Sequence, residues 1–332
     1  TIDNAFPAVL LNSPANNSVI LPGATLDFDI VDTDLNSVTW NVGSGANTFS
    51  PPYDISTTNW SDGHVNITVV ANDNSNHTVT VAFHFIVDSV QPTIVLNGPS
   101  NNSVIQAGTA IDFTVTDVNI GTATWDNGSG SLALASPYDI ATAGWADGGF
   151  DVSVVATDIA GNSAYRNVHI TVDSAAPTVT LVSPSNGSVI PAGTVIDLGV
   201  ADTNFQNASW TNGSTWNALV SPFDISTAGW ADGPSTVTVA ATDLAGNRRT
   251  ATLAFTIDST PPSVTLGSPA NNSYQLAGVV LDFSVSDTNL ASATWNNTSG
   301  AQAFSSPFDV SSTGWADGAF DVEVVAFDLA GN

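Results

Sequence analysis

The chain repeats itself every 85 residues, and this period limits the possible fold more than any other feature of the sequence. Four sets of residues keep the period without an insertion or a deletion: Trp40, Trp125, Trp210 and Trp295; Trp60, Trp145, Trp230 and Trp315; Asp73, Asp158, Asp243 and Asp328; and Pro7, Pro92, Pro177 and Pro262. A fixed period is typical of arrays that repeat one supersecondary unit. The sequence therefore predicts four domains, which we name repeat 1 (1–88), repeat 2 (89–173), repeat 3 (174–258) and repeat 4 (259–332).

Within each repeat, apolar and polar residues alternate with a period of two. In residues 25–31, for example, Leu26, Phe28 and Ile30 fall on one face, and the turn-forming cluster 32–36 follows. Such alternation is typical of half-buried antiparallel strands. About seven strands per repeat, with turns every ~8–12 residues, indicate an all-β chain of β-sandwiches.

The composition excludes several classes of function. The chain has 30 acidic and 3 basic residues, a net charge of -27, no lysine and no cysteine. We therefore expect no nucleic-acid binding through phosphate contacts, no docking on anionic lipid, no disulfide and no thiolate site. No apolar run approaches the ~20 residues of a membrane-spanning helix, so we expect no membrane insertion. Charged residues make up only 10%, which indicates a surface of Asn, Ser, Thr and Gly.

A family resemblance appears in the last part of each repeat. Residues 156–162 read ATDIAGN and residues 241–247 read ATDLAGN, while 171–177 and 256–262 have the form of a strand end and a short linker. These segments resemble the last hairpin and the linkers of prokaryotic immunoglobulin-like and hyalin-type repeats. The resemblance implies four tandem immunoglobulin-like β-sandwich domains in an extended rod. Such arrays form stalks of surface adhesins, surface-layer proteins and add-on modules of secreted enzymes.

Three kinds of tryptophan are distinguished by position. We expect Trp40 and its three counterparts, on the third strand, to pack in the sandwich core. Trp60 and its counterparts precede a strand, and we expect them to close one end of the sandwich, with ligand stacking as the alternative. Trp216 has no tryptophan counterpart in the other repeats and is expected to be a surface contact.

Aspartates are the candidate metal ligands. In an immunoglobulin-like topology, the linker, the turn between the second and third strands, and the last hairpin meet at the junction between repeats. The residues so placed form three sets: Asp88, Asp117, Asn119 and Asp158; Asp173, Asp202, Asn204 and Asp243; and Asp258, Asp287, Asn289 and Asp328. Clustered carboxylate and carbonyl oxygens suit Ca²⁺. The alternative is that these Asp and Asn residues only cap turns, and no EF-hand loop is present.

Glycosylation is predicted at four asparagines. Many Asn-x-Ser/Thr sequences occur in the chain, but four of them recur in register in a turn: Asn16, Asn101, Asn186 and Asn271. A turn of a secreted protein is a suitable place for an N-glycan, in an organism that has the machinery.

No pattern for catalysis is present. No histidines have metal-binding spacing, and the chain has neither a Gly-x-Ser-x-Gly elbow nor a phosphate-binding loop. Four nearly identical repeats also argue against one specialised cleft. We therefore predict that the chain is not an enzyme and needs no organic cofactor.

The two ends of the chain suggest continuation. Residues 1–3 match 171–173 at the end of a repeat, while 329–332 stop before a strand that matches 250–255. We expect that last strand of repeat 4 to come from further residues of the same chain or from a neighbouring subunit by strand addition. The expected partners are thus further copies of the array or neighbouring subunits.

The predicted function is structural. The array would be an extracellular fibre, stalk or surface-layer element at the cell surface, and each added repeat would lengthen it. The alternative is an adhesin or a carbohydrate-binding array that uses exposed aromatic residues and binds surface glycans.

Overall fold

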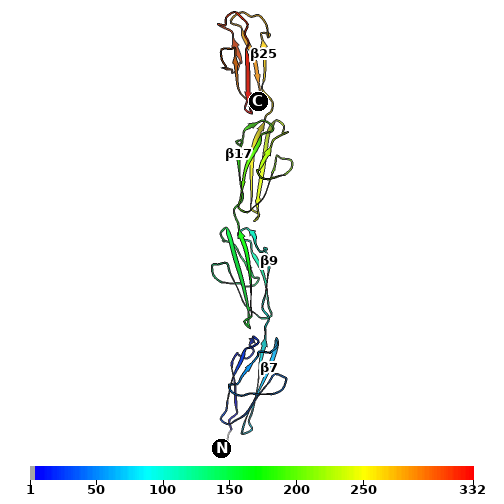
Figure 1. Ribbon diagram of the computed structural model, residues 1–332, viewed down its shortest axis with the longest axis vertical. Coiled ribbons are helices and arrows are strands. Elements are labelled where there is room, and N and C mark those ends of the chain that lie inside the picture. Colours follow the sequence, from blue (N-terminus) through cyan, green and yellow to red (C-terminus); the bar gives the residue numbers. More distant parts are fainter. Residues whose placement is uncertain (1–3) are drawn as a thin grey trace. The chain divides into compact units, whose positions relative to one another are not determined.

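The structure is a computed structural model of the chain, and it describes residues 4–332. Every regular element among these residues is a β-strand (Figure 1). The chain divides into two compact units, Thr1–Asp173 and Ser174–Asn332, and each is described by itself. The sequence match at residues 1–3 lies outside the described residues.

Repeat 1 consists of two sheets. Its strands are β1 (Ala8–Ser13), β2 (Val19–Ile20), β3 (Thr25–Val31), β4 (Leu35–Asn41), β5 (Asn47–Thr48), β6 (Asp54–Ser56), β7 (Gly63–Asp73) and β8 (Thr78–Val87). One sheet has the order β1-β3-β6 and the other β2-β8-β7-β4-β5. Strand β1 pairs with β3 in the first sheet. The chain then crosses to the second sheet, where β2 runs parallel to β8.

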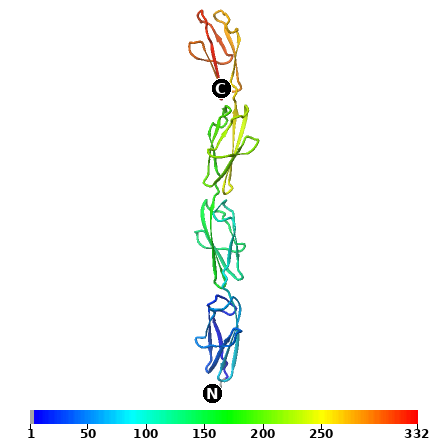
Figure 2. The ribbon, with the colours of Figure 1, turned by 45° about the vertical axis from the view of Figure 1, so that its right-hand side comes forward.

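Repeats 2 and 3 have the same arrangement. The strands of repeat 2 are β9 (Thr93–Gly98), β10 (Ser103–Ile105), β11 (Ile111–Thr116), β12 (Ile120–Asp126), β13 (Leu132–Ala133), β14 (Asp139–Ile140), β15 (Gly148–Asp158) and β16 (Ser163–Val172). Those of repeat 3 are β17 (Thr178–Ser183), β18 (Val189–Ile190), β19 (Val195–Ala201), β20 (Phe205–Thr211), β21 (Asn217–Leu219), β22 (Asp224–Ser226), β23 (Gly233–Asp243) and β24 (Arg248–Ile257). Each of these repeats has one three-stranded and one five-stranded sheet, whose strands can be followed by their colours in Figure 2.

Repeat 4 has two three-stranded sheets. Its strands are β25 (Ser263–Ser268), β26 (Val280–Ser286), β27 (Leu290–Asn296), β28 (Gln302–Ala303), β29 (Asp309–Ser311) and β30 (Glu323–Asp328). The sheet orders are β25-β26-β29 and β28-β27-β30. In the described part of this repeat, no strands correspond to β2 and β8.

The core of each repeat lies between its two sheets. In repeat 1, Leu26 and Phe28 of β3 are fully buried against Ile67 and Val69 of β7. Phe28 also meets Phe83 of β8 in an edge-to-face contact with a centroid distance of 5.2 Å. The alternation seen in the sequence is therefore the alternation of core-facing and outward-facing side chains. The all-β fold, with immunoglobulin-like sheet pairs in tandem, is confirmed.

The last hairpin of repeat 1 differs in sequence from the others, which left its form open. Asn76 occupies the position of Gly161, and both residues have a positive φ, 68° for Asn76 and 104° for Gly161. Asparagine tolerates this region better than most other residues. The amide of Asp73 donates to the carbonyl of His77 at 3.1 Å, just as Asp158 donates to Asn162 at 3.0 Å. The turn is therefore preserved despite the change of sequence.

The tryptophans of repeat 2 are partly buried and pack against its core. Trp125 is partly buried and stacks on Trp145 at a centroid distance of 6.0 Å, and Trp145 contacts Phe150 at 4.7 Å. The centre of the repeat 2 core is instead filled by smaller side chains such as Phe113 and Ile140, each 1% exposed. Trp125 thus packs against the core as expected, although its ring is only partly buried and Trp145 stacks on it. Trp216, by contrast, is exposed as expected.

This arrangement predicts a graded loss of stability. Phe113→Ala empties a fully buried position and is expected to lower the free energy of unfolding of repeat 2 by about 3–5 kcal/mol. Trp125→Ala removes a partly exposed ring and is expected to cost less, about 2–3 kcal/mol. Differential scanning calorimetry of the full chain should show one transition moving to lower temperature in each variant, further for Phe113→Ala. A larger shift for Trp125→Ala would show that the tryptophan is the centre of the core after all.

Candidate functional site

The linker between repeats 1 and 2 is held by the repeat that precedes it. Asp88 follows directly after β8, and its amide donates to the carbonyl of Ile20 at 3.0 Å. Asp62, in the turn before β7, accepts a hydrogen bond from the amide of Ser89 at 3.0 Å and one from its hydroxyl at 2.9 Å. The Asp88 carboxylate in turn accepts from the amide of Val90 at 2.9 Å. The linker therefore has a defined backbone path.

The same linker is also held by the repeat that follows it. Asn119, in the turn between β11 and β12, donates from Nδ2 to Oδ2 of Asp88 at 2.7 Å. Asn162, at the end of the β15–β16 hairpin, donates from Nδ2 to the Asp88 carbonyl at 3.1 Å. Leu21 of repeat 1 lies against this hairpin, 3.9 Å from the position of a Cβ on Gly161. Asp88 is thus bonded to both repeats.

Local turn chemistry places the other two carboxylates. Asp117 accepts a hydrogen bond from the amide of Asn119 at 2.8 Å, and this is the Asx-turn bond that favours Asp at such positions. Asp158 accepts from the amides of Gly161 and Asn162 at 2.6 and 2.8 Å, and from Nδ2 of Asn162 at 2.7 Å. The motif Asp-x-x-Gly-Asn therefore forms a hairpin whose first residue turns its carboxylate toward the last.

The first predicted set is brought together at this junction. One carboxylate oxygen from each of Asp88, Asp117 and Asp158 lies within 4.8 Å of the others. Asp88 and Asp158 are buried, with 9% and 4% exposure. Asn119 joins them through its bond to Asp88. Metal binding by this cluster stays a prediction.

Unit Ser174–Asn332 contains the same arrangement between repeats 3 and 4. Asp258, Asp287 and Asp328 also have carboxylate oxygens within 4.8 Å of one another. Asn289 donates from Nδ2 to Oδ2 of Asp258 at 2.7 Å, and Asn332 donates to the Asp258 carbonyl at 2.9 Å. The junction geometry is therefore a repeated feature of the chain.

The second predicted set is divided between the two units, so its parts are described separately. In the first unit, the amide of Asp173 donates to the carbonyl of Ile105 at 2.9 Å. In the second unit, the amide of Asn204 donates to Asp202 at 2.7 Å, and Nδ2 of Asn247 donates to Asp243 at 2.8 Å. These are the bonds that the equivalent residues form at the other two junctions.

A further acidic cluster in repeat 1 was not predicted. Asp32, Asp34 and Asp73 have carboxylate oxygens within 4.8 Å of one another. They stand 85 residues before Asp117, Asn119 and Asp158, so the period itself could have found them. His77 replaces the hairpin asparagine, and its Nδ1 lies 2.7 Å from Oδ2 of Asp73.

Two of the clustered aspartates have lowered pKa values. Burial by itself would raise the pKa of Asp328, but hydrogen bonds from Asn332 and from the amides of Gly331 and Ala330 outweigh it and keep the pKa below its ordinary value. Burial likewise opposes the lowering at Asp73, where hydrogen bonds from His77 and its charge keep the pKa low. Both carboxylates are therefore stabilised in the ionised form.

The linker-holding aspartates were also missed. Asp62, Asp147, Asp232 and Asp317 recur every 85 residues in the turn that follows the second tryptophan. Asp232 accepts hydrogen bonds from the amide of Ser259 at 2.9 Å and from Oγ1 of Thr260 at 2.7 Å, as Asp62 does from Ser89. The recurrence of the Trp-x-Asp-Gly motif was the available signal.

The predicted glycosylation sites have a structural role that explains their register. The side-chain oxygens of Asn16, Asn101 and Asn186 accept hydrogen bonds from strand amides of His84, His169 and Ala254 at 2.8, 2.7 and 2.8 Å. Asn271 accepts from the amide of Asn272 at 2.9 Å. All four residues are exposed. These bonds use Oδ1 of each asparagine, whereas a glycan is attached to Nδ2. The bonds therefore do not test glycosylation, which stays a prediction.

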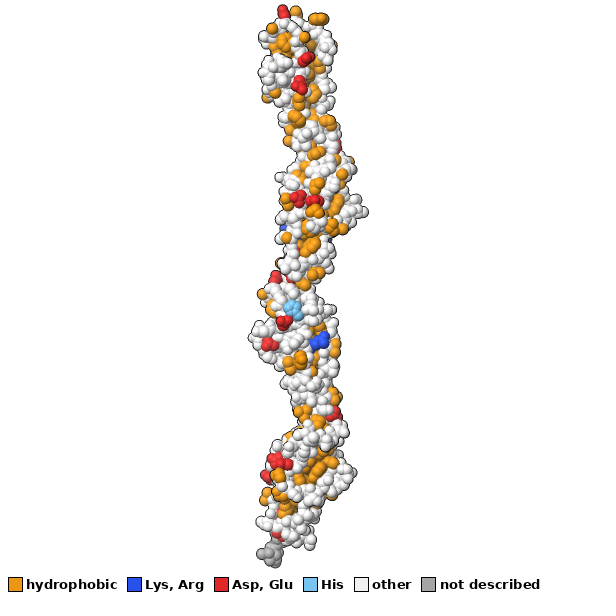
Figure 3. All heavy atoms as spheres, viewed as in Figure 1, with side chains coloured by type: hydrophobic (Ala, Val, Ile, Leu, Met, Phe, Trp, Pro, Cys, Tyr) orange, Lys and Arg blue, Asp and Glu red, His pale blue; other side chains and the backbone are white. Residues whose placement is uncertain are grey.

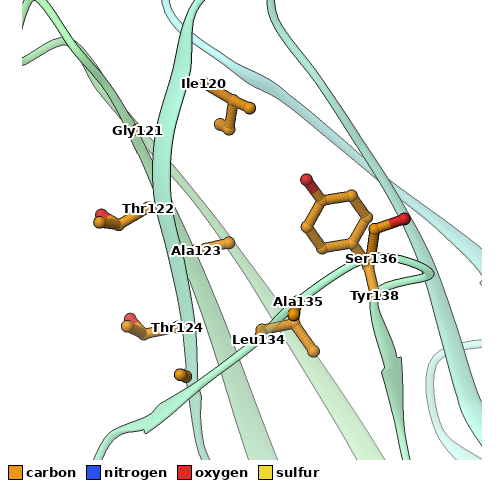
Figure 4. Close-up of a pocket in the computed structure, with 10 residues that line it drawn as sticks. Ile120, Gly121, Thr122, Ala123, Thr124, Leu134, Ala135, Ser136 and Tyr138 are labelled. Atoms are coloured by element: carbon orange, nitrogen blue, oxygen red, sulfur yellow. The ribbon is translucent and has the colours of Figure 1, made fainter.

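The hollows of repeat 2 do not assemble a catalytic group of residues. One, of about 420 Å³, lies beside β12 and is lined by Ile120, Ala123, Leu134 and Tyr138 among others; Figure 4 shows these mainly apolar and small side chains. A second hollow contains His169, whose Nδ1 lies 2.7 Å from Asp151. The equivalent pair in repeat 1 is His84 with Asn66, so these two histidines keep the 85-residue register.

The surface agrees with the composition. On the face seen in Figure 3, uncharged polar and apolar atoms predominate, and carboxylates appear in small groups. Two ion pairs are found among residues 4–332, and both join a histidine to an aspartate. No helix in the described part of the chain is long and apolar enough to cross a bilayer.

Comparison with known proteins finds similarity to solved structures but no match in sequence. No family model matches the chain, and no curated protein matches it. Similar solved structures include an I-band fragment of titin, with 14% identity and a TM-score of 0.46, over 77% of this chain and 100% of that one. A tetra-tandem repeat from the extending region of a large adhesion protein has 17% identity and a TM-score of 0.32, over 98% and 96%. Fibronectin(III)-like modules of Clostridium thermocellum CbhA have 21% identity and a TM-score of 0.34, over 50% and 94%. Because these TM-scores are below 0.5, the likenesses carry no argument about function.

The hydrogen bonds that Asp232 accepts from the linker predict that the stability of the folded chain depends on pH. Hydrogen bonds from Thr260 and from the amide of Ser259 keep the pKa of Asp232 below its ordinary value, against a smaller opposing effect of burial. The folded chain therefore holds a proton at Asp232 less tightly than the unfolded chain, where the pKa is about 3.9. The stabilisation is present above about pH 4 and is lost as the pH falls through the lowered pKa.

Carboxyl ¹³C NMR titration should measure this lowered pKa directly. Thr260→Val removes the strongest hydrogen bond and is expected to raise the pKa of Asp232 toward its ordinary value. Thr256→Val, on the neighbouring strand β24, is the matched control and should leave it unchanged. Equal titration curves for the parent chain and Thr260→Val would show that the hydrogen bond does not form in solution.

Proposed function

We propose that the chain is a structural, adhesion-type tandem array of the cell exterior, in which each repeat is a spacer. The observation that carries the proposal is the linker: Asp88 and Asp258 are each hydrogen-bonded to both of the repeats that they join. A junction of this kind gives every added repeat the same connection to its neighbour, which suits a protein whose purpose is reach. The four domains with boundaries after residues 88, 173 and 258 are part of the proposal.

The composition supports an exterior location. The chain has no cysteine and no lysine, and its surface presents Asn, Ser and Thr side chains with aspartate as the common charge. A net charge of -27 discourages lateral association between copies through self-repulsion. A fibre, a stalk and a surface-layer element are the forms that we propose for the array, with further copies or neighbouring subunits as its partners.

A second candidate function is supported by one residue. Trp216, in the loop between β20 and β21, is 52% exposed, although aromatic rings of this size are usually covered. An exposed indole is suited to stacking on a sugar ring. A carbohydrate-binding array is therefore the alternative to a spacer.

The location can be tested on cells that produce the protein. Antibodies against the chain are expected to label intact cells as strongly as permeabilised cells, because the array lies outside. Labelling that appears only after permeabilisation would contradict the proposal.

Glycan binding separates the two candidates. A spacer is expected to show no retention on immobilised polysaccharides, and Trp216→Ala should behave as the parent chain does. Retention that is lost in Trp216→Ala but kept in Phe6→Ala, which alters another exposed aromatic residue, would favour the binding array.

A further inference from the structure

We propose that Asn212, in the loop between β20 and β21, is a site of spontaneous chemical modification. Its side-chain amide is converted to a carboxylate, and the hydroxyl of Ser214 assists the reaction. The conversion consumes water, releases ammonia and needs no enzyme. The inference concerns the chemistry of one loop and does not depend on the location or the function of the array.

The tripeptide Asn-Gly-Ser occurs three times in the chain, at Asn127, Asn186 and Asn212. Glycine after an asparagine favours the conversion, because it has no Cβ to obstruct its own amide nitrogen and its backbone adopts unusual conformations easily. Asn97 also precedes a glycine, but it lies within strand β9, and Pro99 follows that glycine. Since the three tripeptides are identical, differences in their reactivity depend on the folded structure around each.

The reaction joins the side chain of the asparagine to the next peptide bond. The amide nitrogen of the following glycine loses its proton to solvent hydroxide and attacks Cγ of the asparagine, so that a C–N bond forms. The bond between Cγ and Nδ2 then breaks, and Nδ2 takes one proton from water and leaves as ammonia. Water opens the resulting five-membered imide at either carbonyl, which gives aspartate or isoaspartate.

At Asn212 the structure leaves the reacting groups available. Residues 212–216 are all exposed. Oγ of Ser214 donates to Oδ1 of Asn212 at 3.0 Å, and this bond stabilises the negative charge that the oxygen gains during the attack. The amide of Gly213 donates to Oγ1 of Thr211 at 3.1 Å, and a neutral hydroxyl holds that proton less strongly than a carboxylate does. Asn212 thus combines an activated carbonyl with a weakly held nucleophile.

Asn186 has the opposite environment in the same repeat. Its Oδ1 accepts a hydrogen bond from the amide of Ala254 at 2.8 Å, and the amide of Gly187 donates to the Ala254 carbonyl at 2.8 Å. The side chain and the nucleophile are therefore both bonded to strand β24. Because the nitrogen must turn toward Cγ for the attack, both bonds would have to break, and we expect the fold to protect Asn186.

Asn127 lies between these two cases. Its Oδ1 accepts a hydrogen bond from the amide of Ser129 at 3.2 Å, which polarises the carbonyl. The amide of Gly128, however, donates to the Asp126 carboxylate at 2.7 Å, and this charge-assisted bond makes the loss of the proton more difficult. The reaction is therefore expected to be fastest at Asn212, slower at Asn127 and slowest of the three at Asn186.

The conversion would change the surface near Trp216. Each converted Asn212 adds a carboxylate to the loop that carries this exposed indole, and isoaspartate also adds a methylene to the backbone. Since the reaction removes Nδ2, an asparagine that has reacted can no longer carry an N-glycan.

The test follows the three tripeptides in the full chain, produced in a host without N-glycosylation and incubated at slightly alkaline pH. Samples are digested with pepsin, whose acidic conditions slow the reaction, and mass spectrometry measures the fraction of each peptide in which NH₂ has been replaced by OH. Asn212 is expected to react at least about tenfold faster than Asn186, equivalent to about 1.4 kcal/mol in activation free energy. In guanidinium chloride, which unfolds the chain, the three tripeptides should react at equal rates.

Two serine variants test the role of the hydroxyl. Ser214→Ala removes the donor to Asn212 and is expected to slow the reaction there several-fold, with the rate at Asn186 unchanged. Ser188→Ala is the matched control, because it makes the same change in the other tripeptide, where the hydroxyl donates to the carbonyl of Ser185, and it should leave the rate at Asn212 unchanged. Equal rates at Asn212 and Asn186 in the folded chain would overturn the proposal, as would a Ser214→Ala variant that reacts as fast as the parent.

Discussion

The hydrogen bonds that aspartate carboxylates accept from nearby N–H groups are the interaction on which the rest of this structure depends. They close the turn at Asp117 and the hairpin at Asp158, and they hold the linker at Asp62 and Asp88. A hydrogen bond to a charged group contributes about 1.5–3 kcal/mol, more than a typical neutral one. In a chain without cysteine, these bonds take the place that covalent cross-links hold in other small β-sandwich domains.

The same interaction lets negative charge accumulate without many cations. The chain has 3 basic residues for 30 acidic ones, so ion pairing cannot stabilise the carboxylates. Backbone amides and asparagine side chains do so instead, because they direct partial positive charge at the oxygens. The pairing of Asp with Asn at corresponding points of the repeats follows from this need: Asn162 and Asn332 each bond both a hairpin aspartate and a linker carbonyl.

Much of the fold could be predicted from the sequence, because the 85-residue period and the alternation of residues such as Leu26 and Phe28 report directly on repeats and on strand faces. The meeting of Asp88 with Asp158 was also predictable once the immunoglobulin-like topology was assumed, because that topology brings linker and hairpin to one end. How deeply a given side chain is buried could not be predicted from the sequence. Trp125 lies on the expected strand and packs against the core, yet it is only partly buried, and it is the last residue but one of β12.

Other residues of the site recur at the 85-residue period, but the prediction from sequence did not include them. Asp62 and Asp232 recur in register, but sequence alone does not show that the turn they occupy lies beside the following linker. Asp34 and His77 occupy positions where the other repeats have asparagine, so a search for identical residues passes over them. Oδ1 of Asn119 is buried and accepts no hydrogen bond from the described residues, and this depends on the orientation of one amide group, which only coordinates reveal.

The central claim is that side-chain hydrogen bonds on the linker fix the connection between successive repeats. Single-molecule energy transfer tests it most directly, since a chain without cysteine can be labelled at two introduced ones, Val31→Cys and Tyr165→Cys, both at exposed positions. The account predicts one narrow distribution of distances between the dyes. It also predicts that Asn162→Ala, which removes the bonds to Asp88 and Asp158, broadens the distribution, while Ser129→Ala in a surface loop does not. A parent chain whose distribution is already as broad as that of Asn162→Ala would contradict the account.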